Sequence, residues 1–302
     1  MTRNATRRRF LAAGVLAAAP LRAFKSHITR ARISAITDEI GATQADAMAF
    51  AQEFGLQWLE LRTLPETKQE FASMTEPELL RWHAGLAANK IKVSFLNTSV
   101  LKFTWPGLAA GDASESDQKK WDRRKDDLAA ALRAATVLGV DKIGIFTGTR
   151  VPRPETAYPL IARTLEELIP LADQAKVRLA IANDATQNIG TSAEAKALLD
   201  LLPSKTIGLS WNPQDALALK ETPWPDGYAL LPKGHLLNAH IQAAGVLNNS
   251  STRLNWRAIM EAMQRDNYAG EIALETHAPA DTLIENAKES MRIVLHMAGE
   301  LS

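Results

Sequence analysis

The sequence predicts an α/β protein whose single domain is a (β/α)8 barrel. Two observations support this prediction: eight short apolar runs occur along the chain, and longer amphipathic stretches separate them. The alternative is an open doubly wound sheet, but no GxGxxG sequence follows the first apolar run. A barrel takes about 250 residues, which fits residues 33–302 as one domain behind an N-terminal segment of residues 1–32.

The eight apolar runs are the predicted strands. Most of them are continuously apolar, as expected for parallel strands that are covered on both faces. The predicted strands are Ile33–Thr37, Gln57–Leu61, Ile91–Leu96, Lys142–Phe146, Val177–Ile181, Ile207–Trp211, Leu236–Ile241 and Glu271–Leu274.

The stretches between the strands carry start and stop signals for helices. Thr43 is a candidate N-cap and Gly55 a candidate C-cap. Thr75 with Glu78 has the spacing of a capping box, and a second such pair occurs further along the chain. The predicted helices run from Thr43 to Phe54, from Thr75 onward, over Asp117–Leu138 and Thr156–Ala175, from Thr191 onward (with Glu194), and over Trp256–Arg265 and Asp281–Ala298.

Residues 1–32 form a basic head. Its segment "TRRRFLAAGVLAAAP" matches the twin-arginine export pattern, and the apolar run is shorter than the roughly 20 residues that span a bilayer. We therefore expect a cleaved signal read by the export machinery, no stable membrane anchor, and a periplasmic or extracellular location; a disordered basic tail is the alternative. Without this head acidic residues outnumber basic ones, so no nucleic acid is expected as a partner. The absence of cysteine excludes a thiolate site.

Four segments carry a family resemblance. "ISAITDEIG", "WLELRT", "IGLSWNPQDAL" and "GEIALETH" together resemble the xylose-isomerase-like TIM-barrel superfamily, in particular its exported branch of sugar phosphate isomerase/epimerase proteins. The resemblance covers the chain from about Ile33 onward. It implies one divalent metal (Mn, Zn or Mg) that polarises the sugar, held by a Glu ending strand five, an Asp ending strand six, a His on strand seven and a Glu ending strand eight. Two glutamates then move the proton.

The family's metal ligands are only partly present. His240 in "LNAHIQ" and Glu275 in "IALETH" match the family residues, whereas Ala182 replaces the strand-five glutamate and Asn212 the strand-six aspartate. The resemblance therefore implies a reduced or altered metal site, because hard divalent ions depend on oxygen charge. A displaced metal set would restore that charge; its members are Asp184, Asp215, His240 and Glu275. The alternative is that the two aspartates only cap turns.

Two functional hypotheses follow. The first is an exported sugar isomerase/epimerase-like, or lyase-like, enzyme that acts on a sugar or keto-sugar by enolisation, with Glu275 and His277 as catalytic groups. The second is a catalytically inactive, carbohydrate-binding descendant. A metal endonuclease is set aside because the six histidines are scattered. The candidate substrate-binding residues are Glu60, Arg62, Asn97, Lys102, Trp105, Asn183, Trp211 and Asn212.

Two groups of these residues carry more specific expectations. Trp105 and Trp211 are candidate stacking platforms for a sugar ring, or else core residues. Glu39 and Glu60 are expected to hold the barrel mouth together with Arg62 or Lys102, an ion pairing that by itself is weak evidence for function.

Overall fold

Eight strands alternate with helices in the computed structural model, which describes residues 27–108, 113–247 and 251–300. The strands are β1 (Ile33–Ala35), β2 (Trp58–Leu61), β3 (Lys92–Asn97), β4 (Lys142–Ile145), β5 (Arg178–Ala182), β6 (Ile207–Trp211), β7 (Leu236–Gln242) and β8 (Ile272–Glu275). The helices are α1 (Gln44–Phe54), α2 (Glu76–Ala88), α3 (Glu115–Asp122), α4 (Arg124–Leu138), α5 (Tyr158–Ala175), α6 (Ser192–Leu199), α7 (Pro213–Ala218), α8 (Tyr228–Leu230), α9 (Trp256–Arg265) and α10 (Leu283–Glu300). All eight predicted strands are confirmed, with bounds that differ by at most a few residues.

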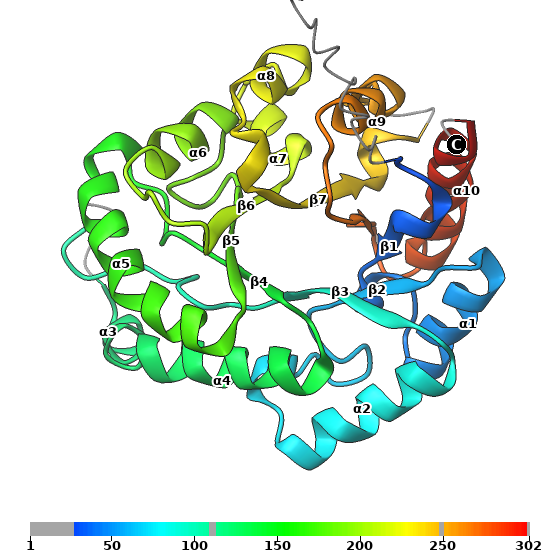
Figure 1. Ribbon diagram of the computed structural model, residues 1–302, viewed down its shortest axis with the longest axis horizontal. Helices are drawn as coiled ribbons and strands as arrows, with labels where there is room; N and C mark the ends of the chain where they lie inside the picture. The colour runs from blue at the N-terminus through cyan, green and yellow to red at the C-terminus, as the bar shows by residue number, and fades with distance from the viewer. Residues whose placement is uncertain (1–26, 109–112, 248–250, 301–302) are drawn as a thin grey trace, which may run out of the picture.

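The strands form one parallel sheet that closes on itself (Figure 1). The order is β1-β8-β7-β6-β5-β4-β3-β2, and the first strand pairs with the last, with Ile33 opposite Ile272. The two ends of this order, β1 and β2, meet at an isolated parallel bridge between Ile36 and Glu60. The predicted (β/α)8 barrel is therefore confirmed.

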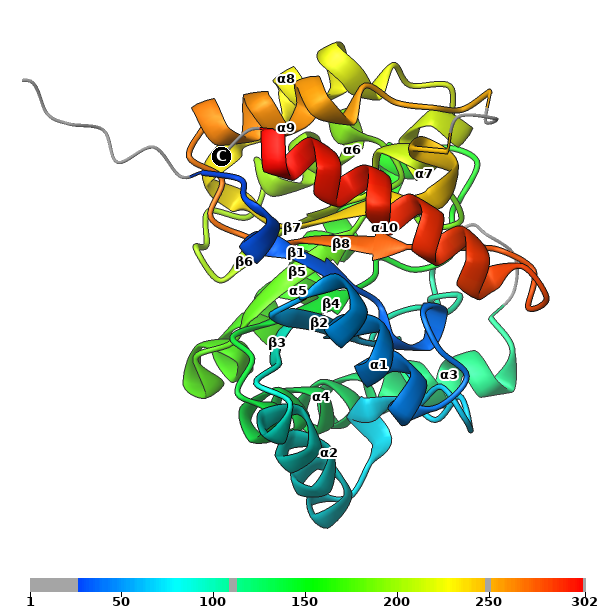
Figure 2. The ribbon, with the colours of Figure 1, turned by 90° about the vertical axis from the view of Figure 1, so that its right-hand side faces the viewer.

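The helices surround the barrel, and α10 crosses in front of β8 in the side view (Figure 2). Their buried faces pack with the strands into the main hydrophobic core. The predicted caps of α1 are confirmed: the Thr43 side chain accepts a hydrogen bond from the backbone N–H of Asp46, and Gly55 has a φ of 63°. Glycine adopts this left-handed conformation without strain, so it ends the helix and starts the turn into β2.

The predicted helix over Asp117–Leu138 is wrong in its continuity, because Arg123 interrupts it. Arg123 has a φ of −90° and a ψ of 1° and separates α3 from α4. The α4 helix buries an apolar face that includes Leu128, whereas α3 buries no residue. Packing against the core therefore sets the direction of α4 but not that of α3. The break places Trp121 against Trp105, with ring centroids 5.2 Å apart.

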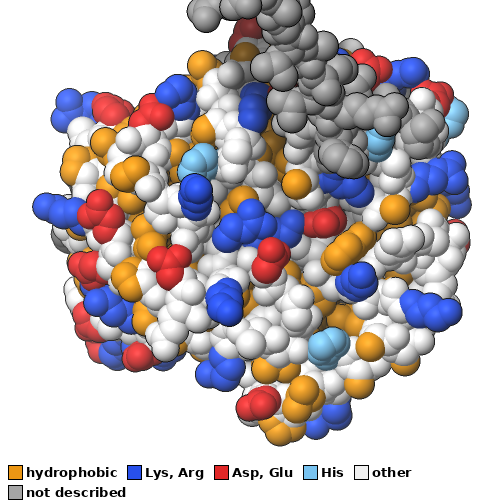
Figure 3. Space-filling model, viewed as in Figure 1, with side chains coloured by type: hydrophobic (Ala, Val, Ile, Leu, Met, Phe, Trp, Pro, Cys, Tyr) orange, Lys and Arg blue, Asp and Glu red, His pale blue; other side chains and the backbone are white. Residues whose placement is uncertain are grey.

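The twin-arginine pattern lies outside the described residues, in residues 1–26. Packing begins directly after them, since Ile28 is wholly buried and the guanidinium of Arg32 donates to the backbone oxygen of Tyr268. None of the helices in the described ranges is long and apolar enough to cross a membrane. The face shown in Figure 3 mixes basic, acidic and apolar side chains rather than gathering one kind.

Inside the barrel, apolar and polar side chains lie side by side. Phe95, Ala180 and Leu237 come from alternate strands and form a small apolar cluster separate from the main core, as the side-chain layers of such barrels do. Gly144 on β4 makes room for this packing, because a Cβ there would lie 2.6 Å from Oδ1 of Asn97 and 3.0 Å from the Phe95 ring. The absence of a side chain at Gly144 therefore leaves room for the amide of Asn97 inside the barrel.

Candidate functional site

A cavity of about 340 Å³ opens where the strands end, the place where barrels of this kind carry their chemistry. It brings together ten of the residues singled out in the sequence. These are Arg62, Asn97, Lys102, Asn183, Asp184, Asn212, Asp215, His240, Glu275 and His277, and Ala182 lines the same cavity.

Glu275, the last residue of β8, is buried in the wall of this cavity and is surrounded by N–H donors. Its Oε2 accepts hydrogen bonds from Nδ2 of Asn212 at 2.9 Å and Nε2 of Gln242 at 3.3 Å. Its Oε1 lies 3.0 Å from Nε2 of His277 and 3.5 Å from NH1 of Arg62. Burial raises the pKa of this carboxyl, but the hydrogen bond from His277 and the surrounding cations outweigh burial and hold the pKa well below its usual range. Glu275 is therefore an ionised acceptor.

Arg62 is the cation that joins three carboxylates from two parts of the mouth, the turn after β1 and the end of β8. Its NH2 lies 2.9 Å from Oδ2 of Asp38 and 2.7 Å from Oε1 of Glu39, both directly after β1. Burial lowers the pKa of Arg62, but Glu39 and Asp38 raise it further, so the net shift is upward. The expected pairing of Glu39 with Arg62 is confirmed. The sequence could not predict that Arg62 also contacts Asp38 and Glu275, because these contacts depend on β1, β2 and β8 meeting in space.

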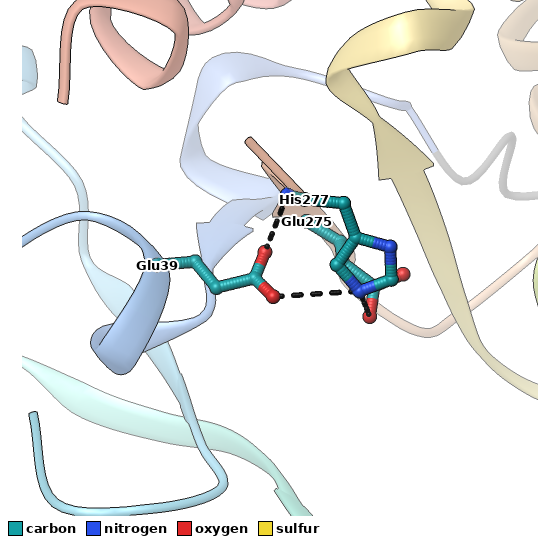
Figure 4. A group of neighbouring side chains, drawn as sticks. All are labelled: Glu39, Glu275 and His277. Carbon is teal, nitrogen blue, oxygen red and sulfur yellow. Dashed lines mark hydrogen bonds and ion pairs between the residues drawn. The ribbon is translucent and has the colours of Figure 1, made fainter. Parts of the chain in front are cut away.

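Glu39, Glu275 and His277 face one another at the mouth (Figure 4). Among the described residues they are the only group of three or more His and acidic residues whose candidate ligand atoms all lie within 4.8 Å of one another. Glu39 also accepts hydrogen bonds from the backbone N–H groups of Thr276 and His277. These bonds support His277 in a left-handed conformation, with a φ of 46°, which costs about 1 kcal/mol. The bond to Glu275 is the main cause that raises the pKa of His277 to about 9.

His240 on β7 is oriented from below by the wholly buried Glu60. Its Nε2 lies 2.8 Å from Oε1 of Glu60, and its Nδ1 lies 3.9 Å from Oε2 of Glu275. Asn97 and Asn238 also donate to Glu60. Burial lowers the pKa of His240, but Glu60 outweighs it and raises the pKa to about 9. The expected pairing of Glu60 with Arg62 or Lys102 is wrong, because its partners are His240 and the two amides.

The displaced metal set is not assembled within the described part of the chain. Asp184 turns to Lys102, with 3.2 Å between Oδ2 and Nζ, and its other oxygen accepts the backbone N–H of Thr186. This is turn capping, the alternative reading of Asp184. Asp215 in α7 lines the cavity, where burial and then the charges of Glu275 and Asp184 raise its pKa to about 7. Neither aspartate belongs to the group of ligand atoms within 4.8 Å.

The two tryptophans expected to stack on a sugar are core residues instead. Trp105 is wholly buried, and its Nε1 donates to the backbone oxygen of Leu101 at 3.0 Å. Trp211 is also wholly buried, packs on Tyr228 with ring centroids 5.5 Å apart, and donates to Ser192 at 3.2 Å. Neither side chain lines the cavity. A short apolar sequence motif cannot distinguish these two outcomes.

Comparison with solved structures places this architecture among known barrels. The chain is similar to the IOLI protein with a bound zinc atom, with a TM-score of 0.68 and 12% identity over 90% of this chain and 99% of the other. It is similar to D-psicose 3-epimerase in the presence of D-fructose, with a TM-score of 0.66 and 13% identity over 89% and 99%. It is also similar to a xylose isomerase-like TIM barrel protein from Mycobacterium smegmatis in complex with magnesium, with a TM-score of 0.63 and 15% identity over 88% and 97%. At these identities the likeness shows the fold alone.

The comparison with sequence families is more specific. No curated protein matches the chain significantly. The profile of the xylose isomerase-like TIM barrel family, however, matches residues 48–295, a range that contains seven of the eight strands and all the cavity-lining residues. With the closed eight-stranded barrel and a polar cavity at the strand ends, this match shows that the chain belongs to the xylose isomerase-like TIM barrel family.

Proposed function

We propose that the protein is a sugar isomerase/epimerase-like enzyme that acts on a sugar or keto-sugar by enolisation. The observation that carries the proposal is the cavity at the strand ends, where a carboxyl group that titrates near neutral pH shares one lining with cationic N–H donors. Family membership and the structural likeness to D-psicose 3-epimerase support the substrate class. Groups that titrate near the working pH are the most effective proton carriers.

Asp215 is the best candidate for the base, although the sequence favours Glu275. Glu275 holds its charge too strongly to accept a proton readily, because its pKa lies well below the usual range. Asp215 lines the same cavity with a pKa of about 7. In the proposed step its carboxylate takes the proton from the carbon next to the sugar carbonyl, and the electron pair moves to the carbonyl oxygen. The hydroxyl proton on the neighbouring oxygen passes to the former carbonyl oxygen, and Asp215 returns its proton to the former carbonyl carbon, so that the carbonyl group moves by one position.

The negative charge that forms on the carbonyl oxygen needs donors. His277 and Arg62 line the cavity and carry N–H groups. Both are anchored by Glu275 and Glu39, so they are held in place before the reaction. Donors that are already oriented stabilise a developing oxyanion without the cost of reorganisation. Glu275 acts in this scheme as a positioning residue for them.

The altered metal site is part of the proposal. Zinc and magnesium are bound by two of the similar structures, and the cluster of Glu39, Glu275 and His277 contains suitable ligand types. As arranged, however, the cluster does not fit a dication, because the guanidinium of Arg62 lies against both carboxylates. No step of the proposed reaction therefore uses a metal.

Deuterium exchange tests the enzyme proposal directly. Hexoses and ketohexoses are incubated with the protein in D2O, and proton NMR follows loss of the signal next to the carbonyl. We expect exchange that Asp215→Asn lowers at least 100-fold. Glu194→Gln is the matched control, because Glu194 binds Arg150 outside the cavity. Exchange that survives Asp215→Asn refutes this base.

The second candidate function is carbohydrate binding without turnover. Ala182 favours it, because this methyl group lines the cavity where the family carries a second carboxylate. Saturable binding of a sugar by calorimetry, with no deuterium exchange in wild-type protein, would establish this candidate in place of the enzyme.

We also propose export by the twin-arginine route, with a periplasmic or extracellular location. Thr6-Arg7-Arg8-Arg9-Phe10-Leu11 supports it. Cell fractionation is expected to find the wild-type chain outside the cytoplasm and the variant with both Arg7→Lys and Arg8→Lys inside it. Arg22→Lys is the control, and export of the double variant would contradict this route.

A further inference from the structure

We propose that the guanidinium of Arg62 takes the place of a divalent metal in this cavity and keeps such ions out. The inference rests on the proposed function only for the identity of the ligand, a sugar. The experiment that tests it measures metal binding and needs no sugar. It rests on three features of the mouth: the position of Arg62, the saturation of Glu275 by donors, and the orientation of Asn212.

Arg62 already provides the positive charge that the acidic cluster requires. Glu39, Glu275 and His277 form the only candidate cation cluster among the residues described. NH2 of Arg62 lies 2.7 Å from Oε1 of Glu39, and NH1 lies 3.5 Å from Oε1 of Glu275. The same guanidinium binds Asp38 at 2.9 Å. A dication at this position would have to displace a cation that is held by three carboxylates.

Glu275 has no oxygen left for a metal. Asn212 and Gln242 donate to Oε2, and His277 and Arg62 face Oε1. Asn212, Gln242 and His277 hydrogen-bond to this carboxylate, which offers about four acceptor positions, and Arg62 lies beside it as an ion-pair partner. A metal bound to either oxygen would break at least one of these contacts.

The orientation of Asn212 is fixed by the helix that follows it. Its Oδ1 accepts the backbone N–H of Gln214 at 3.2 Å, as an N-cap of α7. The amide nitrogen therefore points at Glu275, at 2.9 Å. Asn212 faces the cavity as a donor, and flipping its amide to offer oxygen to a metal would break both the cap and the bond to Glu275. With Ala182 at the end of the neighbouring strand β5, neither of these two positions supplies a ligand.

Arg62 is also placed to contact a ligand. Its side chain is 30% exposed, while the acidic partners are 6–8% exposed, so Arg62, like His277, presents N–H groups to the cavity that it lines. Its fixed N–H groups suit the hydroxyl and carbonyl oxygens of a sugar. The charge that a metal would bring is thus supplied by a group that no chelator removes.

The test compares metal uptake by Arg62→Met and Arg62→Lys. Protein is purified without chelator, its metal content is measured by plasma mass spectrometry, and its melting temperature is followed with added Zn²⁺, Mn²⁺, Mg²⁺ or EDTA. We expect wild-type protein to hold less than about 0.1 metal ion per chain. We also expect its melting temperature not to change when EDTA is added. Arg62→Met frees the three-residue cluster and is expected to gain a metal-dependent rise in melting temperature. Arg62→Lys keeps the positive charge and is expected to gain none.

Arg150→Met is the matched control, because Arg150 also pairs with a partly buried glutamate but lies outside the cavity. About one metal ion per wild-type chain would overturn the inference, and this measurement needs no variant to fold. Equal uptake by Arg62→Met and Arg62→Lys, or no uptake by a folded Arg62→Met, would also overturn it. None of these readouts uses a sugar, so a failure of the proposed enzyme activity shows separately in the deuterium experiment.

Discussion

Replacement of Asp215 by asparagine is expected to stabilise the protein, and to do so more strongly as the pH rises. The pKa of this carboxyl is raised from 3.8 to about 7 by burial and by the neighbouring charges of Glu275 and Asp184. A carboxyl whose pKa is higher in the folded than in the unfolded chain lowers stability above its unfolded pKa. The penalty grows until the pH passes the folded pKa.

The magnitude follows from the size of the shift. At about 1.4 kcal/mol per pKa unit, the rise corresponds to at most about 4 kcal/mol. The side chain is not fully buried, and solvent screening lowers this figure to about 2 kcal/mol. That difference should develop between the unfolded pKa of 3.8 and the folded pKa of about 7. Asparagine has the same shape and no charge, so it avoids the penalty.

Urea denaturation of wild-type protein and Asp215→Asn at several pH values measures this effect. We expect the difference in the free energy of unfolding to be small at about pH 4 and to favour the variant by about 2 kcal/mol at pH 8. Asp200→Asn is the control, because this exposed carboxylate pairs with Lys196 within a helix and should give a nearly flat difference. A flat profile for Asp215→Asn would refute the raised pKa and, with it, the choice of base.

Three further substitutions test other parts of the structure. Gly144→Ala should lower stability by about 1–3 kcal/mol in urea, because the new Cβ collides with Asn97; an unchanged midpoint would contradict this packing. Trp105→Phe should lower the free energy of unfolding by about 1–2 kcal/mol, because the ring loses its hydrogen bond to Leu101 and part of its volume. Calorimetry should find an unchanged affinity for sugar; a weaker affinity would show that Trp105 contacts the ligand. Glu275→Gln should cost about 1–3 kcal/mol at pH 7, and the difference should shrink progressively as the pH falls below the unfolded value of 4.5, because the lowered pKa of the native carboxyl means that its stabilising contribution is lost only as the pH approaches the folded pKa; a difference that stays constant from pH 7 down to about pH 3 would contradict this reasoning.

The fold could be predicted because its signals are local. Continuous apolar runs mark strands covered on both faces, and caps such as Thr43 and Gly55 mark helix ends within a few residues. The alternation of these elements then leaves few topologies. The prediction of one continuous helix over α3 and α4 is wrong because both halves have helical sequences, and the break at Arg123 goes with a tertiary contact, Trp121 on Trp105, that the local sequence does not show.

The candidate site could be located but not resolved from the sequence. Residues that end parallel strands must converge, so the cavity contains most of the predicted residues. Which side chain pairs with which depends on the stagger of distant strands: Glu60 meets His240, and Arg62 meets Glu275. Burial is equally non-local, which is why Trp211 could be read as a ligand platform.

The closure of the barrel has a consequence for synthesis of the chain. In the described part of the chain the first strand forms its ladder with the last one, with Ile33 opposite Ile272, and Glu39 binds the backbone of Thr276, 237 residues later. A nascent chain therefore cannot complete either structure until its final segment has left the ribosome. The mouth assembles last, and a product that terminates before β8 would lack Glu275 and His277 as well as the strand that closes the barrel around the pocket.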